Sequence, residues 1–170
     1  MPDDTMHRRD HPDAGPGLFG RVRGRVFHWW FLASRPMTLG VRGLVLDRPA
    51  NTVLLVRHTY VPGWQLPGGG VEPGETMPHA LRRELAEEAN VTLEGEATLV
   101  SLHFNRNASR RDHVALFVVE RFRQDAPRRG DHEIAEARFF ALDSLPDTTT
   151  PATRRRLSEV LGGAPASHYW

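Results

Sequence analysis

The chain has 170 residues, a length typical of one domain, and its 39% apolar and 25% charged residues are ordinary for a globular protein. Its formal net charge of +1 gives no overall field that would attract nucleic acid or an anionic membrane, so any charge-based function has to be local. Cysteine is absent, which excludes disulfides, thiolate nucleophiles and cysteine-ligated metal sites. Lysine is absent as well, which excludes Schiff-base chemistry on a lysine.

The first 17 residues are polar, carry charges of both signs and are rich in turn-forming residues. This composition is typical of a disordered tail, which is our interpretation of residues 1–17. We do not expect a signal peptide there, because the apolar stretch of such a peptide is missing. No apolar run in the chain approaches the ~20 residues that span a bilayer, so we expect a cytoplasmic protein without integral membrane association. The stretch GPGLFG at 15–20 matches G-x-G-x-x-G, but a charged tail and not a strand precedes it, so we reject a dinucleotide site there.

Residues 18–37 form an amphipathic segment in which arginines alternate with valines and aromatic residues follow. The spacing favours a short helix that ends before Pro36. Arginines beside Trp29 and Trp30 are typical of a membrane-surface or partner-binding segment, whereas the same aromatics could instead cover the core or a dimer contact. A homodimer is therefore one of our predictions.

The remaining chain alternates β-branched runs with turn residues and two helical patterns. The predicted strands cover 41–47, 52–59, 97–105, 113–122 and 136–142, with a brief extended piece at 64–66, and the predicted helices cover 77–89 and 151–161. Strands around one central helix, with a second helix at the end, indicate an α+β fold with αβα layers over residues 38–162. Residues 163–170 are assigned to a C-terminal tail.

A glycine-rich loop leads directly into the first predicted helix. Four glycines lie within seven positions of this loop: Gly68, Gly69, Gly70 and Gly74. Glycine permits positive φ and a close approach of the backbone to a ligand. Pro78 suits the first turn of the helix, and Asn90 suits a left-handed C-terminal cap. The side chains of Leu81, Leu85 and Ala89 share one side of this helix and are expected to face the core.

Glu84, Glu87 and Glu88 share an adjacent side of the same helix, where like charges repel by roughly 0.2–0.5 kcal/mol per pair. Together with backbone carbonyls of the loop they would form an all-oxygen site, which suits Mg²⁺, Mn²⁺ or Ca²⁺. The alternative is a solvated acidic face that pairs with Arg82 and Arg83.

Residues 69–91, GGVEPGETMPHALRRELAEEANV, resemble the signature of the Nudix hydrolases, G-x5-E-x7-R-E-U-x-E-E-x-G-U with U a bulky aliphatic residue. The matching positions are Gly69, Glu75, Arg83, Glu84, Leu85, Glu87, Glu88 and Val91. Asn90 stands where the family usually has glycine. Because asparagine also accepts the left-handed conformation, we expect a small stability cost and intact chemistry. The resemblance extends over about residues 38–162.

The resemblance implies a Nudix fold, which is an αβα sandwich with a mixed β-sheet, and hydrolysis of a nucleoside diphosphate linked to another group. It implies Mg²⁺ or Mn²⁺ as the cofactor. The implied metal ligands are Glu87, Glu88, Glu84 and the backbone carbonyl of Gly68. By the same resemblance, Glu84 would bind the metal or orient the attacking water. The resemblance also implies that Arg83 pairs with Glu75 and holds the loop, with Gly69, against the helix.

The general base is expected outside the signature, and Glu133 is the first candidate because some members of this family draw a base from the loop before a late strand. Glu120 and Glu136 are alternatives, as is the interpretation of Glu133 as a solvated loop residue. His132 precedes Glu133, but the sequence lacks the second histidine of H-E-x-x-H.

Arginines outside the signature are candidates to bind the substrate phosphates, namely Arg57 and Arg106, with Arg110 and Arg111 beside the latter. Each could equally be a solvated surface residue. The sequence leaves a nucleoside triphosphate or damaged nucleotide as the default substrate and gives no reason to expect nucleic acid as a partner. Two other functions stay open: a nucleotide-sensing module without turnover, and an RNA or membrane-surface adaptor that acts through residues 21–35.

Overall fold

The computed structural model describes residues 37–170. Its elements in chain order are β1 (Thr38–Asp47), β2 (Thr52–His58), α2 (Met77–Ala89), β3 (Thr92–Leu93), β4 (Thr98–Phe104), β5 (Asp112–Val119), β6 (Phe122–Arg123), β7 (Ile134–Ala141) and α3 (Pro151–Leu161). The predictions for residues 1–17, for the motif at 15–20 and for the segment 18–37 up to Pro36 lie outside the described residues.

Both predicted helices and all five predicted strands are present. The two largest differences concern the ends of β1 and β5. β1 begins at Thr38, three residues before the predicted start, because Thr38–Gly40 pair in register with Asp112–Val114 of β5. The predicted strand 113–122 is divided, because β5 ends at Val119 and Phe122–Arg123 turn away to pair with β3.

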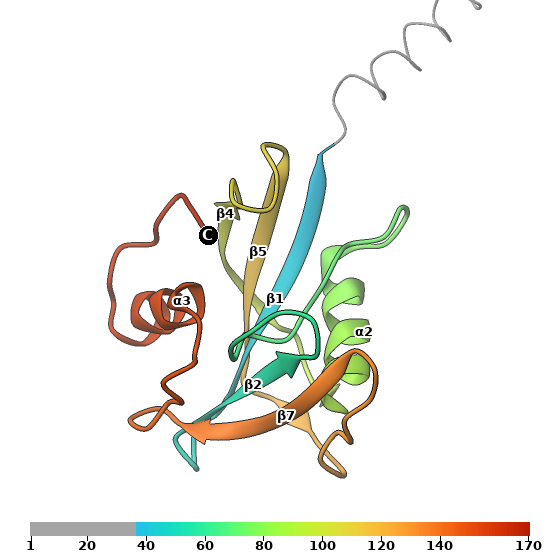
Figure 1. Cartoon of the computed structure of the whole chain (residues 1–170), viewed down its shortest axis with the longest axis vertical. Helices are drawn as coiled ribbons and strands as arrows, with labels where there is room; N and C mark the ends of the chain where they lie inside the picture. The colour runs from blue at the N-terminus through green and yellow to red at the C-terminus, as the bar shows by residue number, and fades with distance from the viewer. Residues whose placement is uncertain (1–36) are drawn as a thin grey trace, which may run out of the picture. The chain divides into compact units, whose positions relative to one another are not determined.

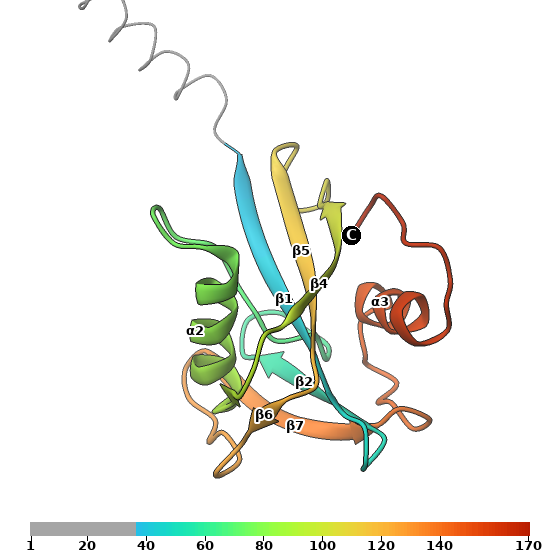
Figure 2. The ribbon, with the colours of Figure 1, turned by 180° about the vertical axis from the view of Figure 1, so that it is seen from behind.

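Within residues 37–170 the five longer strands form one sheet in the order β4-β5-β1-β2-β7. β1 runs parallel to β5, and the other neighbours are antiparallel, so the sheet is mixed. Figures 1 and 2 show α2 and α3 on opposite sides of these strands. The predicted α+β fold, an αβα sandwich with a mixed sheet, is therefore confirmed.

β1 and β2 pair only at Leu46–Val53 and Asp47–Thr52 and then diverge. The glycine-rich loop fills the gap between them. On one side, Gln65 exchanges two backbone hydrogen bonds of 2.9 Å with Val56 of β2. On the other side, the carbonyls of Pro67 and Gly69 each accept a backbone N–H of β1 at 2.9 Å, and the Val71 N–H donates to the carbonyl of Leu39 at 2.8 Å. The loop is thereby fixed as part of the sheet.

Each face of the sheet has its own apolar core. The α2 face buries Leu81, Leu85 and Ala89 completely, as the helical spacing predicted. This helix lies close to β1 at Gly43, where a Cβ would stand 3.1 Å from side-chain carbons of both leucines. The α3 face buries a second cluster: Leu44, Leu46, Val53, Leu55, Trp64, Leu66, Leu116, Phe140 and Leu157. The sheet is thus covered on both faces, and its close packing keeps β1, β2 and the loop between these two strands in place.

The ends of α2 are defined by specific side chains. Thr76 is the N-cap, and its hydroxyl accepts the His79 N–H. Pro78 lies in the first turn, as predicted, and Asn90 adopts the left-handed conformation at φ 55° and ψ 38°. The Asn90 side chain also donates to the Ala126 carbonyl at 2.8 Å. The cap therefore keeps the helix end in place without the glycine usual at this position.

The last residues of the chain pack against β4. The Phe104 N–H donates to the His168 carbonyl at 2.8 Å, and the Trp170 N–H donates to the Phe104 carbonyl at 3.1 Å. In both ribbon views the C-terminus lies beside β4. In residues 37–170 none of the helices has the length and apolar character needed to cross a membrane.

Candidate active site

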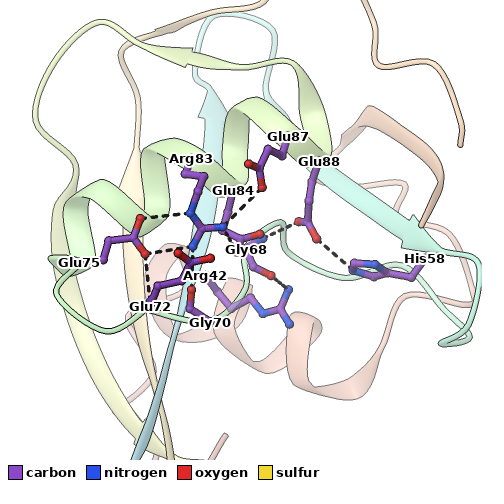
Figure 3. A network of polar contacts seen from close by, with 10 residues as sticks. All are labelled: Arg42, His58, Gly68, Gly70, Glu72, Glu75, Arg83, Glu84, Glu87 and Glu88. Atoms are coloured by element: carbon purple, nitrogen blue, oxygen red, sulfur yellow. Dashed lines mark hydrogen bonds and ion pairs between the residues drawn. The ribbon is translucent and has the colours of Figure 1, made fainter. Parts of the chain in front are cut away.

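Glu88 is the most buried charged residue of the signature helix, with 6% of its surface exposed. Its Oε2 accepts the Gly68 N–H at 2.7 Å, and its Oε1 lies 3.5 Å from Nε2 of His58 (Figure 3). Burial removes water from the carboxylate and raises the pKa of Glu88 to about 7, although the bond from Gly68 opposes this effect. Glu88 is therefore expected to change between its protonated and charged forms near neutral pH.

His58 does not neutralise this charge. Its ring is buried, and burial, followed by the nearby positive charge of Arg42, lowers the pKa of His58 below its usual value. The imidazole is therefore neutral at pH 7. Among residues 37–170, His58 is the only basic side chain within 4 Å of the Glu88 carboxylate. Glu88 is a buried acid without a charged partner of its own.

Arg83 organises the other acidic residues of the signature (Figure 3). Its guanidinium donates to both carboxylate oxygens of Glu75 at 3.1 and 3.0 Å and to the Gly70 carbonyl at 2.9 Å. It also contacts Glu84 at 2.8 Å and Glu87 at 3.4 Å. The bond from Arg83 is the main cause that lowers the pKa of Glu75. Arg83 thus joins the loop to the helix and partly neutralises two of the three clustered glutamates.

Glu84 and Glu87 differ in exposure. The Glu87 side chain is 62% exposed, and the Glu84 side chain is 12% exposed. Burial raises the pKa of Glu84 despite its bond to Arg83. Gly69 lies against the Glu84 carboxylate, so closely that a Cβ there would overlap it. A side chain at this position would therefore displace the Glu84 carboxylate.

A cavity of about 300 Å³ opens over these residues. It is lined by Arg42, His58, Tyr60, Val61, Gln65, Gly68, Gly69, Gly70, Glu84, Glu88 and Glu133. The structure thus brings Glu133, from the loop before β7, to the same cavity as Glu84 and Glu88. Within residues 37–170, no three histidine, aspartate or glutamate side chains are gathered closely enough to hold one metal ion. Glu84 and Glu87 are turned towards Arg83 instead, so the metal-ligand assignment stays a prediction.

The arginines expected to bind phosphate lie outside this cavity. Arg57 pairs with Glu136 at 3.2 Å and lies over the Trp64 ring, in a neighbouring cavity of about 630 Å³. That cavity shares His58, Tyr60 and Val61 with the first one. Arg106 lies over the Tyr169 ring, 4.8 Å from its centre.

The alternatives for the general base lie elsewhere. Glu120 pairs with Arg48 at 2.7 Å, and Glu136 pairs with Arg57. The backbone carbonyl of His132 accepts the Thr59 hydroxyl at 2.6 Å. Arg82 does not join the acidic cluster, because it donates to the carbonyls of Leu93 and Gly95.

Sequence reasoning missed Arg42, His58, Tyr60 and Gln65 as cavity residues. One signal was available for the first two, because Arg42 lies between two buried residues of β1 and His58 closely follows the buried apolar run of β2. Their convergence depends on the loop between β1 and β2, which the residue pattern did not reveal.

A family model described as NUDIX domain matches residues 37–161. The chain belongs to the NUDIX domain family. A Bacillus subtilis relative named "Putative 8-oxo-dGTP diphosphatase" is 29% identical over 127 residues, which cover 75% of this chain and 82% of the relative. An RNA pyrophosphohydrolase of Caulobacter vibrioides is 51% identical over 53 residues, 29% of this chain, and the match spans only 31% of that relative.

Solved NUDIX structures share the fold. A MutT NUDIX hydrolase from Burkholderia pseudomallei has a TM-score of 0.63 and 28% identity, and the match covers 74% of this chain and 98% of that one. A NUDIX hydrolase from Nitrosomonas europaea has a TM-score of 0.61 and 26% identity over 78% of this chain and 77% of that one.

The donor atoms at the cavity fit a hard divalent cation. Carboxylate and carbonyl oxygens are the ligands of Mg²⁺ and Mn²⁺, and the cavity offers Glu84, Glu88 and the loop carbonyls. Burial raises the pKa of both glutamates, so their charged forms lack sufficient compensation in the protein alone. A bound cation would supply that compensation.

Proposed function

We propose that this protein hydrolyses a diphosphate linkage in a nucleoside diphosphate derivative with the help of Mg²⁺ or Mn²⁺, and that its substrate is a nucleoside triphosphate or a damaged nucleotide. The observation that supports this most is the buried Glu88 carboxylate, which lies beside Glu84 and Gly68 at a cavity and has no charged partner of its own.

The chain's own residues would act as follows. Glu84, Glu88 and the Gly68 carbonyl would hold the cation from the cavity wall, and Glu87 would join them from the exposed rim of α2. A bound divalent cation neutralises phosphate charge and lowers the pKa of water. Arg83 would keep Glu84 and the loop in position through its bonds to Glu75 and Gly70.

Glu133 is the favoured general base. It lines the cavity with Glu84 and Glu88, whereas Glu120 and Glu136 are engaged by arginines outside it. The Glu133 N–H donates to the Asp131 carboxylate at 2.9 Å, which holds the backbone of this loop. A carboxylate in this position could take the proton of an attacking water.

The substrate class draws support from the names of the relatives, which include a diphosphatase for 8-oxo-dGTP and RNA pyrophosphohydrolases. These substrates share a phosphate chain on a nucleoside 5′ position. The cavity lined by Arg57, Tyr60 and Trp64 adjoins the acidic one and offers a cation and aromatic rings to such a ligand. Arg57 is therefore our candidate for a substrate phosphate. Arg106 stays a more distant prediction.

The test is a substrate screen on the purified full-length chain, with release of phosphate and pyrophosphate measured in Mg²⁺ and in EDTA. The panel contains dNTPs, oxidised dGTP, 5′-triphosphorylated RNA, ADP-ribose, nucleotide sugars and dinucleoside polyphosphates. We expect metal-dependent turnover, strongest on a triphosphate or an oxidised nucleotide. Nucleotide binding without turnover of any compound would favour the sensing module instead.

The adaptor hypothesis has a separate test, because it depends on residues 21–35. Deletion of residues 1–35 would abolish binding to RNA or liposomes and leave hydrolysis unchanged if that hypothesis is correct. Cytoplasmic location and a homodimer stay predictions from the sequence.

A further inference from the structure

Arg42 and Glu88 bind the two backbone polar groups of the same residue, Gly68. The Arg42 guanidinium donates from Nη1 to the Gly68 carbonyl and, at 3.1 Å, to the Leu66 carbonyl. At the same time the Gly68 N–H donates to Glu88 at 2.7 Å. Figure 3 shows the guanidinium directed at Gly68 from the side opposite Glu88. A positive side chain therefore donates a hydrogen bond to the same carbonyl that, in the proposed function, binds the metal.

The charge of Arg42 is not neutralised by a carboxylate at short range. Among residues 37–170, no aspartate or glutamate oxygen lies within 4 Å of its guanidinium, although it lines the cavity together with Glu84, Glu88 and Glu133. Burial raises the pKa of both Glu84 and Glu88, and the positive charge of Arg42 opposes part of this effect. Arg42 thus supplies part of the positive charge that the acidic cavity requires.

A fixed clamp between β1 and the loop is the simpler interpretation of these bonds. The loop does not depend on Arg42 for this purpose, because three backbone hydrogen bonds of 2.8–2.9 Å already join it to β1 at Leu39, Val41 and Gly43. A half-buried cation that binds only two carbonyls is also free to exchange them for a stronger acceptor. Guanidinium bonds to phosphate are among the strongest charge-assisted hydrogen bonds in proteins.

We propose that Arg42 is an electrostatic placeholder: it holds the Gly68 carbonyl in the metal-free protein, leaves it when a divalent cation binds, and then binds a phosphate oxygen of the substrate. The inference rests on the proposed function, since it assumes a cation at Glu84, Glu88 and Gly68. Its physical basis is that one carbonyl oxygen cannot contact a divalent cation and a guanidinium together without strong repulsion between the two positive groups. Arg42 would therefore couple cation binding to diphosphate binding.

The experiment measures Mn²⁺ affinity without nucleotide, from the electron paramagnetic resonance signal of free Mn²⁺, in wild type, R42Q and R42K. Glutamine removes the charge, so we expect R42Q to bind Mn²⁺ about tenfold more tightly, and R42K to stay near wild type. R48Q is the matched control, because it removes the same charge from the exposed β1–β2 turn, where Arg48 pairs with Glu120 and with no other acidic residue among 37–170. Calorimetry with an α,β-methylene nucleoside triphosphate and Mg²⁺ should then show about tenfold weaker ligand binding in R42Q.

Unchanged or weaker Mn²⁺ binding in R42Q would overturn the placeholder role and leave Arg42 as a clamp. If wild type itself binds no Mn²⁺, the proposed function fails and this inference fails with it. Should R42Q unfold, the wild-type protein suffices: the guanidinium resonance of Arg42, followed by NMR in a Mg²⁺ titration, should shift as the cation binds. A resonance that does not respond to saturating Mg²⁺ would contradict the proposal.

Discussion

Helices α2 and α3 begin in the same way, but the buried charged side chain of each helix has different partners. Both have a threonine N-cap and a proline in the first turn, and they cover opposite faces of one sheet. α3 buries Arg156 completely, and its guanidinium reaches Glu159 at 2.6 Å, His103 at 2.7 Å and the Tyr169 carbonyl at 3.2 Å. α2 buries Glu88, which receives one backbone N–H and no charged partner.

We infer that the difference separates a structural charge from a functional one. Arg156 has a charged partner within the protein, Glu159, and its other bonds tie α3 to β4 and to the C-terminal residues. Glu88 is incompletely satisfied, and it faces a cavity. A buried charge without a fixed partner lowers stability, so its presence on a well-packed helix indicates a ligand that supplies the missing charge.

The largest effect is expected from E88Q, which keeps the shape of the side chain and removes its charge. We expect turnover to fall about 10³-fold, equivalent to about 4 kcal/mol, because the cation loses a buried ligand. Steady-state kinetics on the best substrate of the screen measures this. E96Q is the control, since the Glu96 side chain is 88% exposed and lies away from the cavity, and it should keep wild-type rates. Wild-type rates in E88Q would mean that Glu88 is not a metal ligand.

The matching change in α3 should affect stability instead of chemistry. R156M removes the buried guanidinium and leaves Glu159 and His103 without it, so we expect a loss of about 3 kcal/mol in the free energy of unfolding. Urea unfolding measures this loss. R154M, on the exposed side of the same helix, is the control and should change stability by less than about 1 kcal/mol. A loss as small as that of R154M would show that the Arg156 network contributes little.

The third effect is the part of the pH dependence of stability that comes from Glu88 in α2. The pKa of Glu88 is about 7 in the folded protein and 4.5 in the unfolded reference, so the buried carboxyl favours folding in its protonated form. Its contribution is fully present below pH 4.5 and is lost as the pH rises to about 7. Above that pH, metal-free wild type should be less stable than E88Q by up to about 3 kcal/mol.

Urea unfolding of both proteins in EDTA, from pH 5 to pH 8, measures this difference directly. The comparison with E88Q cancels the opposite contribution of His103, whose pKa is lowered by burial and which lies away from Glu88. Saturating Mg²⁺ should remove the loss in wild type at pH 8. A difference between the two proteins that does not vary with pH would contradict the pKa assigned to Glu88.

Local patterns were sufficient to predict most of the fold. Alternating apolar residues identified the long strands, and helical spacing identified α2 and the residues that it buries. Asn90 could be predicted as a left-handed cap because that conformation depends on the residue itself. The two-residue strands β3 and β6 could not, because each exists only through pairing with a segment about 30 residues away.

The site was predictable only where its residues belong to one motif. Glu84, Glu87 and Glu88 share a helix face through their spacing alone. The convergence of Arg42 and His58 at one cavity was not predictable, because it depends on the loop that enters the gap between β1 and β2. The directions of the Arg57 and Arg106 side chains could not be predicted from the sequence either, because each lies on an aromatic ring from a different segment.

The most direct test of the account is a crystal of the full-length chain soaked in Mn²⁺, with the anomalous signal of manganese recorded. We expect one strong peak within coordination distance of the Glu84 and Glu88 carboxylates and the Gly68 carbonyl, with Arg42 turned away from that carbonyl. A well-ordered site with no manganese peak, and Arg42 still bound to Gly68, would contradict the claim that Glu88 is a metal ligand awaiting its ion.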